Sequence, residues 1–302
     1  MSKITTIRKK LRFRKVLNRI LNITGRKRFC YVNWWKTWIF NLRCFDLKTA
    51  FKLPVFIYNR VDVCWLGKVE LQTDNVYKGM VQIGHWPTRA RNHTIIHRGG
   101  TIIFHGAVTI QGGTILNGGG TLEFGNNVVI GCGCLIENNN HITFNDNVRI
   151  GFQCMIMDTD FHYMINPDTG KVYRNSGDIV IGEGSWVASN CRLMKSTHLP
   201  KDSVVGGGSL VNKDYTSEST AQIYVGTPAK PVKKGRRIHN VNKQGELDKY
   251  FREHPDEKSC VLETEDLDEL CYSYFWGWND RWSKQPIDSY NKVWHKSDKY
   301  TI

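Results

Sequence analysis

A repeat of twenty residues in the middle of the chain constrains the fold more than any other feature. When residues 104–163 are written in rows of twenty, apolar side chains recur in fixed columns: Phe104, Phe124 and Phe144; Val108, Val128 and Val148; Ile110, Ile130 and Ile150; Leu116, Ile136 and Ile156. An amphipathic helix repeats about every 3.6 residues and cannot produce this spacing. We therefore predict a mainly β protein built as a β-solenoid, in which each coil stacks on the previous one.

The period shortens to six residues in the following segment. Aliphatic side chains recur there at Ile181, Val187, Leu193, Leu199, Val205 and Val211, and most of the residues four positions later are small. One branched aliphatic residue in every six predicts a short strand whose large side chain points into a narrow prism. Segments rich in Gly, Asn and Asp, such as residues 118–120, 138–140 and 145–147, are expected to turn the corners between strands.

The repeat is interrupted once. After Ile156 the pattern resumes only at Ile179, so residues 163–178 are predicted to leave the solenoid as a loop, with a tight turn at residues 166–170. His162 occupies the column that contains Leu122 and Ile142 in earlier coils, which places it where the loop departs. Long excursions from a regular scaffold often carry function, so this loop is the first candidate for a site.

The segments just described resemble a known family. Residues 186–190, 205–214 and 226–230, together with the segment 158–162 upstream, are similar to hexapeptide-repeat acyltransferases, and most like the branch that O-acetylates sugars and polysaccharides. The resemblance covers roughly residues 80–235. It implies a left-handed parallel β-helix, a homotrimer, and acetyl-CoA as the cosubstrate. The implied function is transfer of an acetyl group to a hydroxyl of a sugar or surface-polysaccharide precursor.

His162 is the candidate general base for this chemistry. Transfer of an acyl group from a thioester to a hydroxyl requires removal of the hydroxyl proton, and a neutral imidazole suits that task near neutral pH. If residues 158–162 are extended, Asp158 and Asp160 project to the same side as His162. Either carboxylate would then orient the imidazole, and Asp160 is preferred because it is closer in sequence.

The resemblance also implies a cofactor site between neighbouring subunits. By motif position, Ser189, Gly207, Asn212 and Lys213 would line the pantetheine arm and nucleotide, while Lys230 and Lys233 would meet phosphates. The chain departs from the usual pattern at Ala188, Met194, Ser196 and Thr227, which affects individual contacts and acyl size. In the loop, Tyr163, Tyr173 and Arg174 are candidates for contact with the acceptor sugar, although packing against a neighbouring subunit would equally explain them.

The remaining sequence flanks this region on both sides. We divide the chain into a basic, partly helical N-terminal region (residues 1–50), the β-helix acyltransferase domain (51–237) and a C-terminal extension (238–302) that is first acidic and then aromatic. Such an aromatic cluster is typical of a packed cap, with a saccharide-binding platform as the alternative.

Positive charge is concentrated at the start of the chain. The net charge is +14, and residues 1–43 hold thirteen Lys and Arg without one acidic residue. Residues 5–24 are predicted to form a basic amphipathic helix that either lies on an anionic membrane or caps the solenoid. Nucleic-acid binding would rest on this segment alone and is not expected. Without a signal peptide or membrane span, we expect a cytoplasmic protein, peripheral at most to the inner membrane face.

Three other interpretations use the same fold. A zinc-dependent hydratase would need three His ligands, and His105, His141 and His162 do not show the required spacing, so we expect no metal. A non-catalytic solenoid that binds a partner stays open, because repeat proteins often serve as scaffolds. An N-acyltransferase of an amino sugar is the third alternative.

Overall fold

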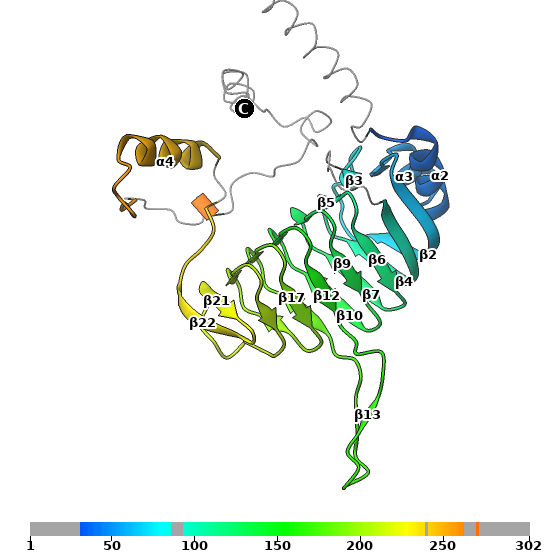
Figure 1. Ribbon diagram of the computed structural model, residues 1–302. Helices are drawn as coiled ribbons and strands as arrows, with labels where there is room; N and C mark the ends of the chain where they lie inside the picture. Colours follow the sequence, from blue (N-terminus) through cyan, green and yellow to red (C-terminus); the bar gives the residue numbers. More distant parts are fainter. Residues whose placement is uncertain (1–30, 86–92, 239–240, 263–269, 272–302) are drawn as a thin grey trace, which may run out of the picture.

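The protein is a stack of parallel β-coils, which confirms the predicted parallel β-helix (Figure 1). The computed structural model describes residues 31–85, 93–238, 241–262 and 270–271. A nine-stranded sheet forms the first face of the prism. Its strands in spatial order are β1 (Val55–Ile57), β3 (Val81–His85), β5 (Val108–Gln111), β8 (Val128–Ile130), β11 (Arg149–Ile150), β16 (Trp186–Val187), β19 (Val204–Val205), β21 (Gln222–Gly226) and β22 (Ala229–Lys234).

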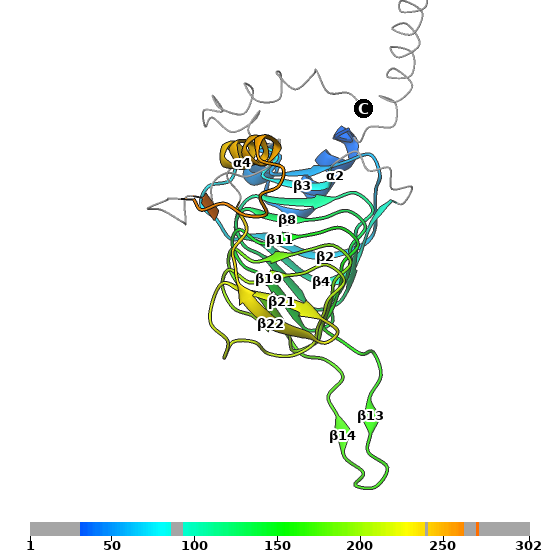
Figure 2. The same ribbon diagram turned by 60° about the vertical axis from the view of Figure 1, so that its left-hand side comes forward.

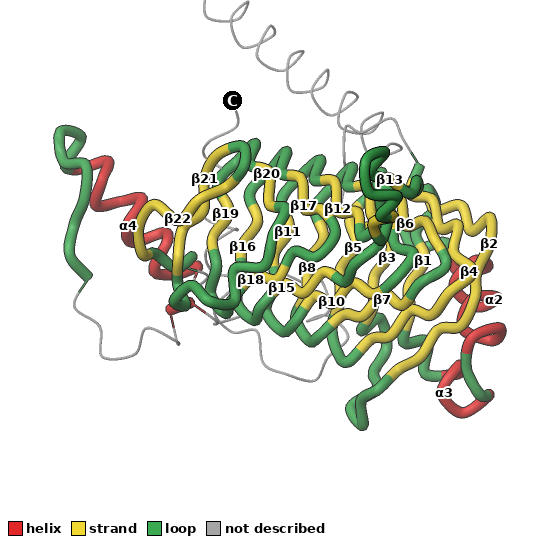
Figure 3. Tube along the Cα trace, turned by 90° about the horizontal axis from the view of Figure 1, so that it is seen from below, coloured by secondary structure: helices red, strands yellow, loops and turns green. Residues whose placement is uncertain are grey.

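An eleven-stranded sheet supplies the other two faces, because the long strand β4 (Thr94–Phe104) bends across both. The first half of β4 pairs with the second face and its last residues pair with the third. The second face continues through β6 (Ile115–Gly118), β9 (Leu135–Glu137), β12 (Met155–Met157), β17 (Arg192–Met194) and β20 (Leu210–Val211). The third face continues through β7 (Thr121–Phe124), β10 (His141–Phe144), β15 (Ile179–Ile181) and β18 (His198–Leu199), and β2 (Val61–Leu71) pairs with β4 at the start of the stack. Figure 3 shows these strands as successive rungs.

The predicted apolar columns are the core. Val108 pairs in register with Val128, Ile130 with Ile150, and Ile156 with Leu193. The rings of Phe104, Phe124 and Phe144 stack with centroid distances of 5.4 and 5.1 Å, and all three side chains are fully buried. Burial of each such side chain contributes about 1.5–3 kcal/mol, so the stacked columns stabilise neighbouring coils together.

Small residues follow these columns because their side chains bind the next coil. The hydroxyl of Thr114 donates to the carbonyl of Gly131 at 3.0 Å. One coil later the thiol of Cys134 donates to Gly151, and the thiol of Cys154 donates to Ala188 at 3.1 Å. These bonds satisfy corner carbonyls between the first and second faces and link each corner to the next coil.

In the described part of the chain, helices α2 (Trp34–Cys44), α3 (Leu47–Phe51) and α4 (Val241–Glu253) lie outside the coils. Helices α2 and α3 lie at the N-terminal end of the solenoid, and α4 follows its last strands (Figure 1). Asn33 and Asp46 cap α2 and α3 by accepting from backbone N–H groups three residues on, which satisfies otherwise unpaired donors. None of the described helices is long and apolar enough to cross a bilayer. The predicted amphipathic helix at residues 5–24 and most of the C-terminal aromatic cluster lie outside the described residues.

Candidate functional site

The predicted excursion from the solenoid is an antiparallel hairpin. Strands β13 (Met164–Ile165) and β14 (Val172–Tyr173) pair with each other, and Figures 1 and 2 show the hairpin projecting away from the coils. The tip is the expected turn: the side-chain oxygen of Asn166 accepts from the N–H groups of Asp168 and Thr169, and Gly170 has a φ of 67°. The hairpin leaves at the corner between the second and third faces.

Asp158 anchors the base of this hairpin inside the protein. Its carboxylate is fully buried and accepts hydrogen bonds from the side chain of Asn138 at 2.6 Å and from the backbone N–H groups of Asn139 and Asn140 at 2.7 and 2.9 Å. The other side of Asn138 accepts from the buried guanidinium of Arg98 at 2.7 Å. These contacts form a polar ladder, Arg98–Asn138–Asp158, that crosses successive coils at the same corner.

Asp160 is fixed by an ion pair instead. Its carboxylate lies 2.5 Å from Nζ of Lys195, and the same ammonium donates to the carbonyl of Arg174 at 2.8 Å. The backbone N–H of Asp160 donates to the carbonyl of Asn175. Lys195 therefore ties both strands of the hairpin base to the coil above it.

His162 is exposed at the start of the hairpin. Its backbone N–H donates to the carbonyl of Asp160 at 2.7 Å. The register pairs Ile142 with Ile179, so Ile179 and not His162 continues the column of Leu122 and Ile142. The sequence-based placement of His162 in that column is therefore corrected.

The segment between Asp158 and His162 is not extended. Phe161 has a φ of 62°, in the left-handed region, which breaks the alternation that would place both carboxylates beside His162. Among the described residues, no hydrogen bond or ion pair joins the imidazole to Asp158 or Asp160. The structure brings the three residues into one segment without making them a bonded triad, and their catalytic roles stay predictions.

Ser189 and Gly207 meet at the opposite edge of the second face. The hydroxyl of Ser189 accepts from the N–H of Phe152 at 3.1 Å, and its carbonyl accepts from the N–H of Gly208 at 3.1 Å. A Cβ built on Gly207 would meet only the carbonyl oxygen of Ser189, at 3.4 Å, so this backbone is open on its outer side. Phe152, half-exposed in the same column, was not singled out from the sequence.

The four remaining cofactor candidates are also exposed. Asn212 and Lys213 follow β20 at the hairpin corner, and Nζ of Lys213 lies 5.0 Å from the ring centroid of Tyr215. Lys230 and Lys233 lie on β22. Lys230 pairs with Val225, and the side chain of Val225 lies beside Gly206. Lys230 is therefore near the corner of Ser189 and Gly207, whereas Asn212 and Lys213 are at the same corner as His162.

Between these two corners the outer surface of the second face is mostly apolar. The positions that alternate with the buried columns hold apolar side chains at Ile115, Leu135, Met155, Met157, Met194 and Leu210, and polar or charged ones at Asn117, Glu137 and Arg192. Arg192 is exposed and lies in register between Met155 and Leu210. The alternation within each short strand is the signal that would have identified them from the sequence. The acceptor candidates Tyr163, Tyr173 and Arg174 are all exposed on the hairpin, with Nζ of Lys171 5.3 Å from the ring centroid of Tyr173.

Another histidine at the hairpin corner was missed. His198 lies between two carboxylates, with Nε2 3.0 Å from Asp178 and Nδ1 3.2 Å from Asp214. Because both ring nitrogens face a carboxylate, neither is turned toward a substrate, and His198 suits a structural bridge. His105 and His141 share the carboxylate of Glu123, and no cluster suited to a metal ion occurs in the part of the chain that the structure describes.

Among known proteins, similarity to this chain is found with solved structures. No protein-family model matches the chain, and no curated protein matches it significantly. Similar solved structures include NeuO, described as a polySia specific acetyltransferase, with 21% identity over 64% of this chain and 97% of that chain and a TM-score of 0.40. OatWY, described as a polysialic acid O-acetyltransferase, has 20% identity over 65% and 94% with a TM-score of 0.39.

A third similar structure is AntD, an N-acyltransferase from Bacillus cereus in complex with dTDP and coenzyme A. It has 15% identity over 70% of this chain and 97% of that chain, with a TM-score of 0.38. At these identities and TM-scores, similarity transfers neither an activity nor a substrate to this chain.

Proposed function

We propose that the protein is an O-acetyltransferase that moves an acetyl group from acetyl-CoA to a hydroxyl of a sugar or surface-polysaccharide precursor. One observation carries the proposal: a mostly apolar face, which also holds Arg192, lies between an exposed histidine at one corner and an open backbone corner at the other. The sequence resemblance of residues 158–162 and 186–230 to O-acetyltransferases supports the same assignment.

The proposed step uses His162 as the base. A ring nitrogen takes the proton of the acceptor hydroxyl while that oxygen attacks the thioester carbonyl. The new C–O bond forms, the C–S bond breaks, and the departing thiolate of CoA receives the proton from the imidazolium. His162 is exposed and can approach an acceptor in this way, which a histidine held between two carboxylates such as His198 cannot do.

We assign positioning roles to the two carboxylates. Asp158 fixes the base of the hairpin from inside the protein, and Asp160 holds the turn before His162 through its carbonyl and its ion pair with Lys195. In this assignment neither carboxylate needs to touch the imidazole, because both act by holding the backbone that carries it.

The mostly apolar second face fits the pantetheine arm of CoA. The arm would run past Ser189 and Gly207 of one subunit, with its thioester over Met155 and Met194, where the hairpin corner of a neighbouring subunit would supply His162. Lys230 and Lys233 would meet phosphates, and Asn212 and Lys213 would lie near the thioester end. Tyr163, Tyr173 and Arg174 would contact the acceptor by stacking and hydrogen bonding. A second subunit of a homotrimer would close the groove.

Replacement of His162 tests the assignment directly. The full chain is incubated with acetyl-CoA and saccharide acceptors, and free thiol release is measured alongside acetyl transfer by mass spectrometry. We expect His162→Ala to lower the transfer rate by about 10²- to 10⁴-fold with unchanged thermal unfolding, because the side chain is exposed. A folded His162→Ala protein that transfers acetyl groups at the wild-type rate would show that His162 is not the base.

A glycine pair tests the cofactor groove. Gly207→Trp would fill the space beside Ser189, whereas Gly119→Trp places the same side chain in open space at another corner. We expect the first variant to lose acetyl-CoA binding at least tenfold by calorimetry, and the second to bind like the wild type. If wild-type protein binds no acetyl-CoA at all, the solenoid is a scaffold; if both variants bind normally, the groove lies elsewhere.

A further inference from the structure

Exposed apolar side chains gather at the N-terminal end of the solenoid, away from the proposed site. Nine of the nineteen large apolar residues that are exposed in the described part of the chain fall within residues 31–65. They are Tyr31, Trp34, Trp35, Ile39, Leu42, Leu47, Phe51, Val63 and Trp65. Scattered exposed apolar residues need no explanation, but a contiguous group of this size marks an interaction surface.

Five of these residues form one continuous face on the two helices. Trp35, Ile39 and Leu42 are spaced four and three residues apart, so they share the outer side of α2, while Phe40 and Asn41 are buried against the coils. Leu47 and Phe51 share a side of α3 in the same way. The rings of Trp38 and Phe51 lie 5.6 Å apart, which joins the two helices. We call Trp35, Ile39, Leu42, Leu47 and Phe51 the N-terminal apolar face.

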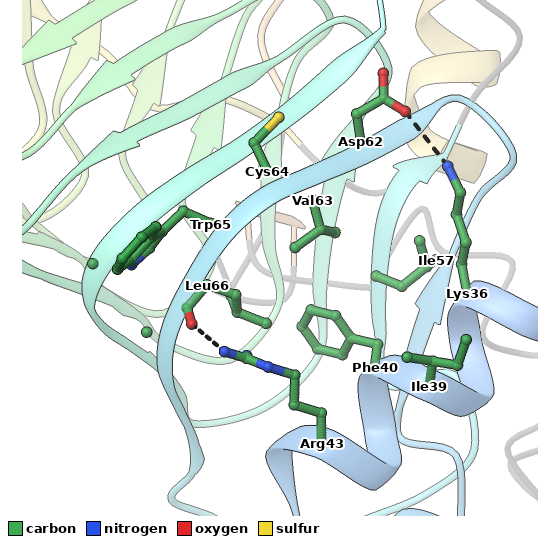
Figure 4. A pocket seen from close by; sticks show the side chains of 12 residues that line it. Lys36, Ile39, Phe40, Arg43, Ile57, Asp62, Val63, Cys64, Trp65 and Leu66 are labelled. Carbon is green, nitrogen blue, oxygen red and sulfur yellow. Dashed lines mark hydrogen bonds and ion pairs between the residues drawn. The ribbon is translucent and has the colours of Figure 1, made fainter.

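A pocket extends this face onto strand β2. In Figure 4, Ile39 and Phe40 line one side of the pocket, while Val63 and Trp65 line the other. The charged groups at its rim are engaged: Nζ of Lys36 lies 3.5 Å from Asp62, and Arg43 donates to the carbonyl of Leu66 at 2.5 Å. The pocket therefore offers apolar atoms with few open polar partners.

The charge around the face is positive. Arg43, Lys48 and Lys52 are exposed on or beside the same helices, and Asp46 is the only acidic residue before Asp62. Residues 1–61 contain sixteen Lys and Arg, eleven of them in the first thirty residues. Tryptophan and aliphatic side chains surrounded by Lys and Arg are the composition of segments that lie at the boundary between lipid headgroups and acyl chains.

We propose that the N-terminal apolar face rests on the surface of an anionic lipid bilayer. Trp35, Ile39 and Phe51 enter the headgroup–acyl boundary, and Lys48 and Lys52 contact anionic headgroups. The basic first thirty residues add long-range attraction to the same surface. In Figures 1 and 2 the β13–β14 hairpin points away from α2 and α3, so contact with the bilayer leaves the hairpin free. This proposal does not depend on the acetyltransferase assignment.

Vesicle flotation tests the proposal with the full chain. The vesicles contain phosphatidylcholine with phosphatidylglycerol, or phosphatidylcholine alone. The test variant is Trp35→Glu with Phe51→Glu, whose side chains are 81% and 66% exposed. The control is Val232→Glu with Val261→Glu, which are 59% and 91% exposed elsewhere and change the net charge equally.

We expect wild type and control to float with the anionic vesicles, and the test variant to bind at least tenfold more weakly. Equal weakening of both variants would show that net charge alone drives binding, and unweakened binding by the test variant would show that the face is not used. Loss of oligomerisation in the test variant, by sedimentation, would identify the face as a contact between copies. Each of these results overturns the proposal.

A measurement on unmodified protein covers the case in which the test variant does not fold. Anionic vesicles whose lipids carry bromine near the headgroup should quench tryptophan fluorescence of the wild type, because Trp35 would lie within the boundary. Absence of quenching on bound vesicles would exclude insertion of this face.

Discussion

At the scale of single residues, His85 shows how burial sets a charge state. His85 ends β3 with 7% of its surface exposed, and its ring packs edge-on against Tyr58 at a centroid distance of 5.1 Å. Burial lowers the pKa of this imidazole from 6.5 to about 4, because the charged form loses its hydration. The folded protein therefore keeps His85 neutral well below neutral pH.

This pKa predicts how stability depends on pH. Between pH 6.5 and about 4 the unfolded chain binds a proton at His85 that the folded chain does not, so stability falls as the pH falls through that window. The loss from this residue totals about 3 kcal/mol by pH 4. Urea unfolding of wild type and His85→Gln at pH 7 and pH 4 should show a smaller decline in the variant. Identical declines would mean that His85 does not carry this dependence.

The segment around His162 shows which residue-level features a sequence pattern can predict. The spacing of Asp158, Asp160 and His162 places all three at the base of the excursion, as expected. It does not reveal the positive φ of Phe161 or the pairing of Asp160 with Lys195, since Lys195 arrives from a later coil. The prediction assumed an extended backbone over this segment, and neither the left-handed residue nor the partner from a later coil can be read from local spacing.

At the scale of elements, the polar ladder decides how firmly the hairpin is attached. Arg98 is fully buried, and burial lowers its pKa to about 10 although Asp158 and Glu137 oppose the shift by their charges. A buried guanidinium needs compensating acceptors, and here it donates to two backbone carbonyls and to Asn138. Asp158 ends the ladder with a buried carboxylate whose charge favours the protonated guanidinium.

Two conservative substitutions separate the anchoring roles of the carboxylates. Asp158→Asn removes the buried charge and one of three acceptor contacts, and should cost about 2–4 kcal/mol of unfolding free energy. Asp160→Asn breaks an ion pair whose side chains are 28% and 40% exposed, and should cost at most about 1 kcal/mol. Denaturant unfolding of both variants makes the comparison. Equal costs would contradict the ladder as the main anchor.

The coils could be predicted from the sequence where the twenty-residue period is regular, and could not be predicted at the start of the stack, where the strand register shifts. From Phe104 onward each column of the repeat is a buried column of the prism. The solenoid nevertheless begins earlier, at β1, because β2 pairs with β4 through two register shifts, between Val63 and Trp65 and between Leu66 and Lys68. Each shift changes the spacing between a residue of β2 and its partner on β4, so apolar residues in the first coil do not recur every twenty residues.

At the scale of the whole molecule, the two halves of the candidate site lie at opposite edges of one face. Ser189 and Gly207 precede strands β17 and β20 in the chain and lie at one edge of the second face, and the hairpin corner lies at the edge where these strands end. Between the corners Leu135, Met155 and Leu210 are half-buried, and the exposed Arg192 lies in register between Met155 and Leu210. A hairpin projecting from the coils, with Tyr163 and Met164 69% and 65% exposed, has apolar surface to place against another chain.

A homotrimer would use both features, with the hairpin of one subunit reaching the groove of the next. Sedimentation should then give about 105 kDa, three times the chain mass of 34.9 kDa.

The sharper test uses two inactive proteins, His162→Ala and Gly207→Trp, which are mixed, unfolded and refolded together. If each site takes His162 from one subunit and Gly207 from its neighbour, mixed trimers contain some sites with both residues intact, and transfer activity returns. Mixtures refolded separately serve as the control. Because a site built within one chain would have one defect in every subunit, activity that stays absent in co-refolded trimers would place the whole site inside a single subunit.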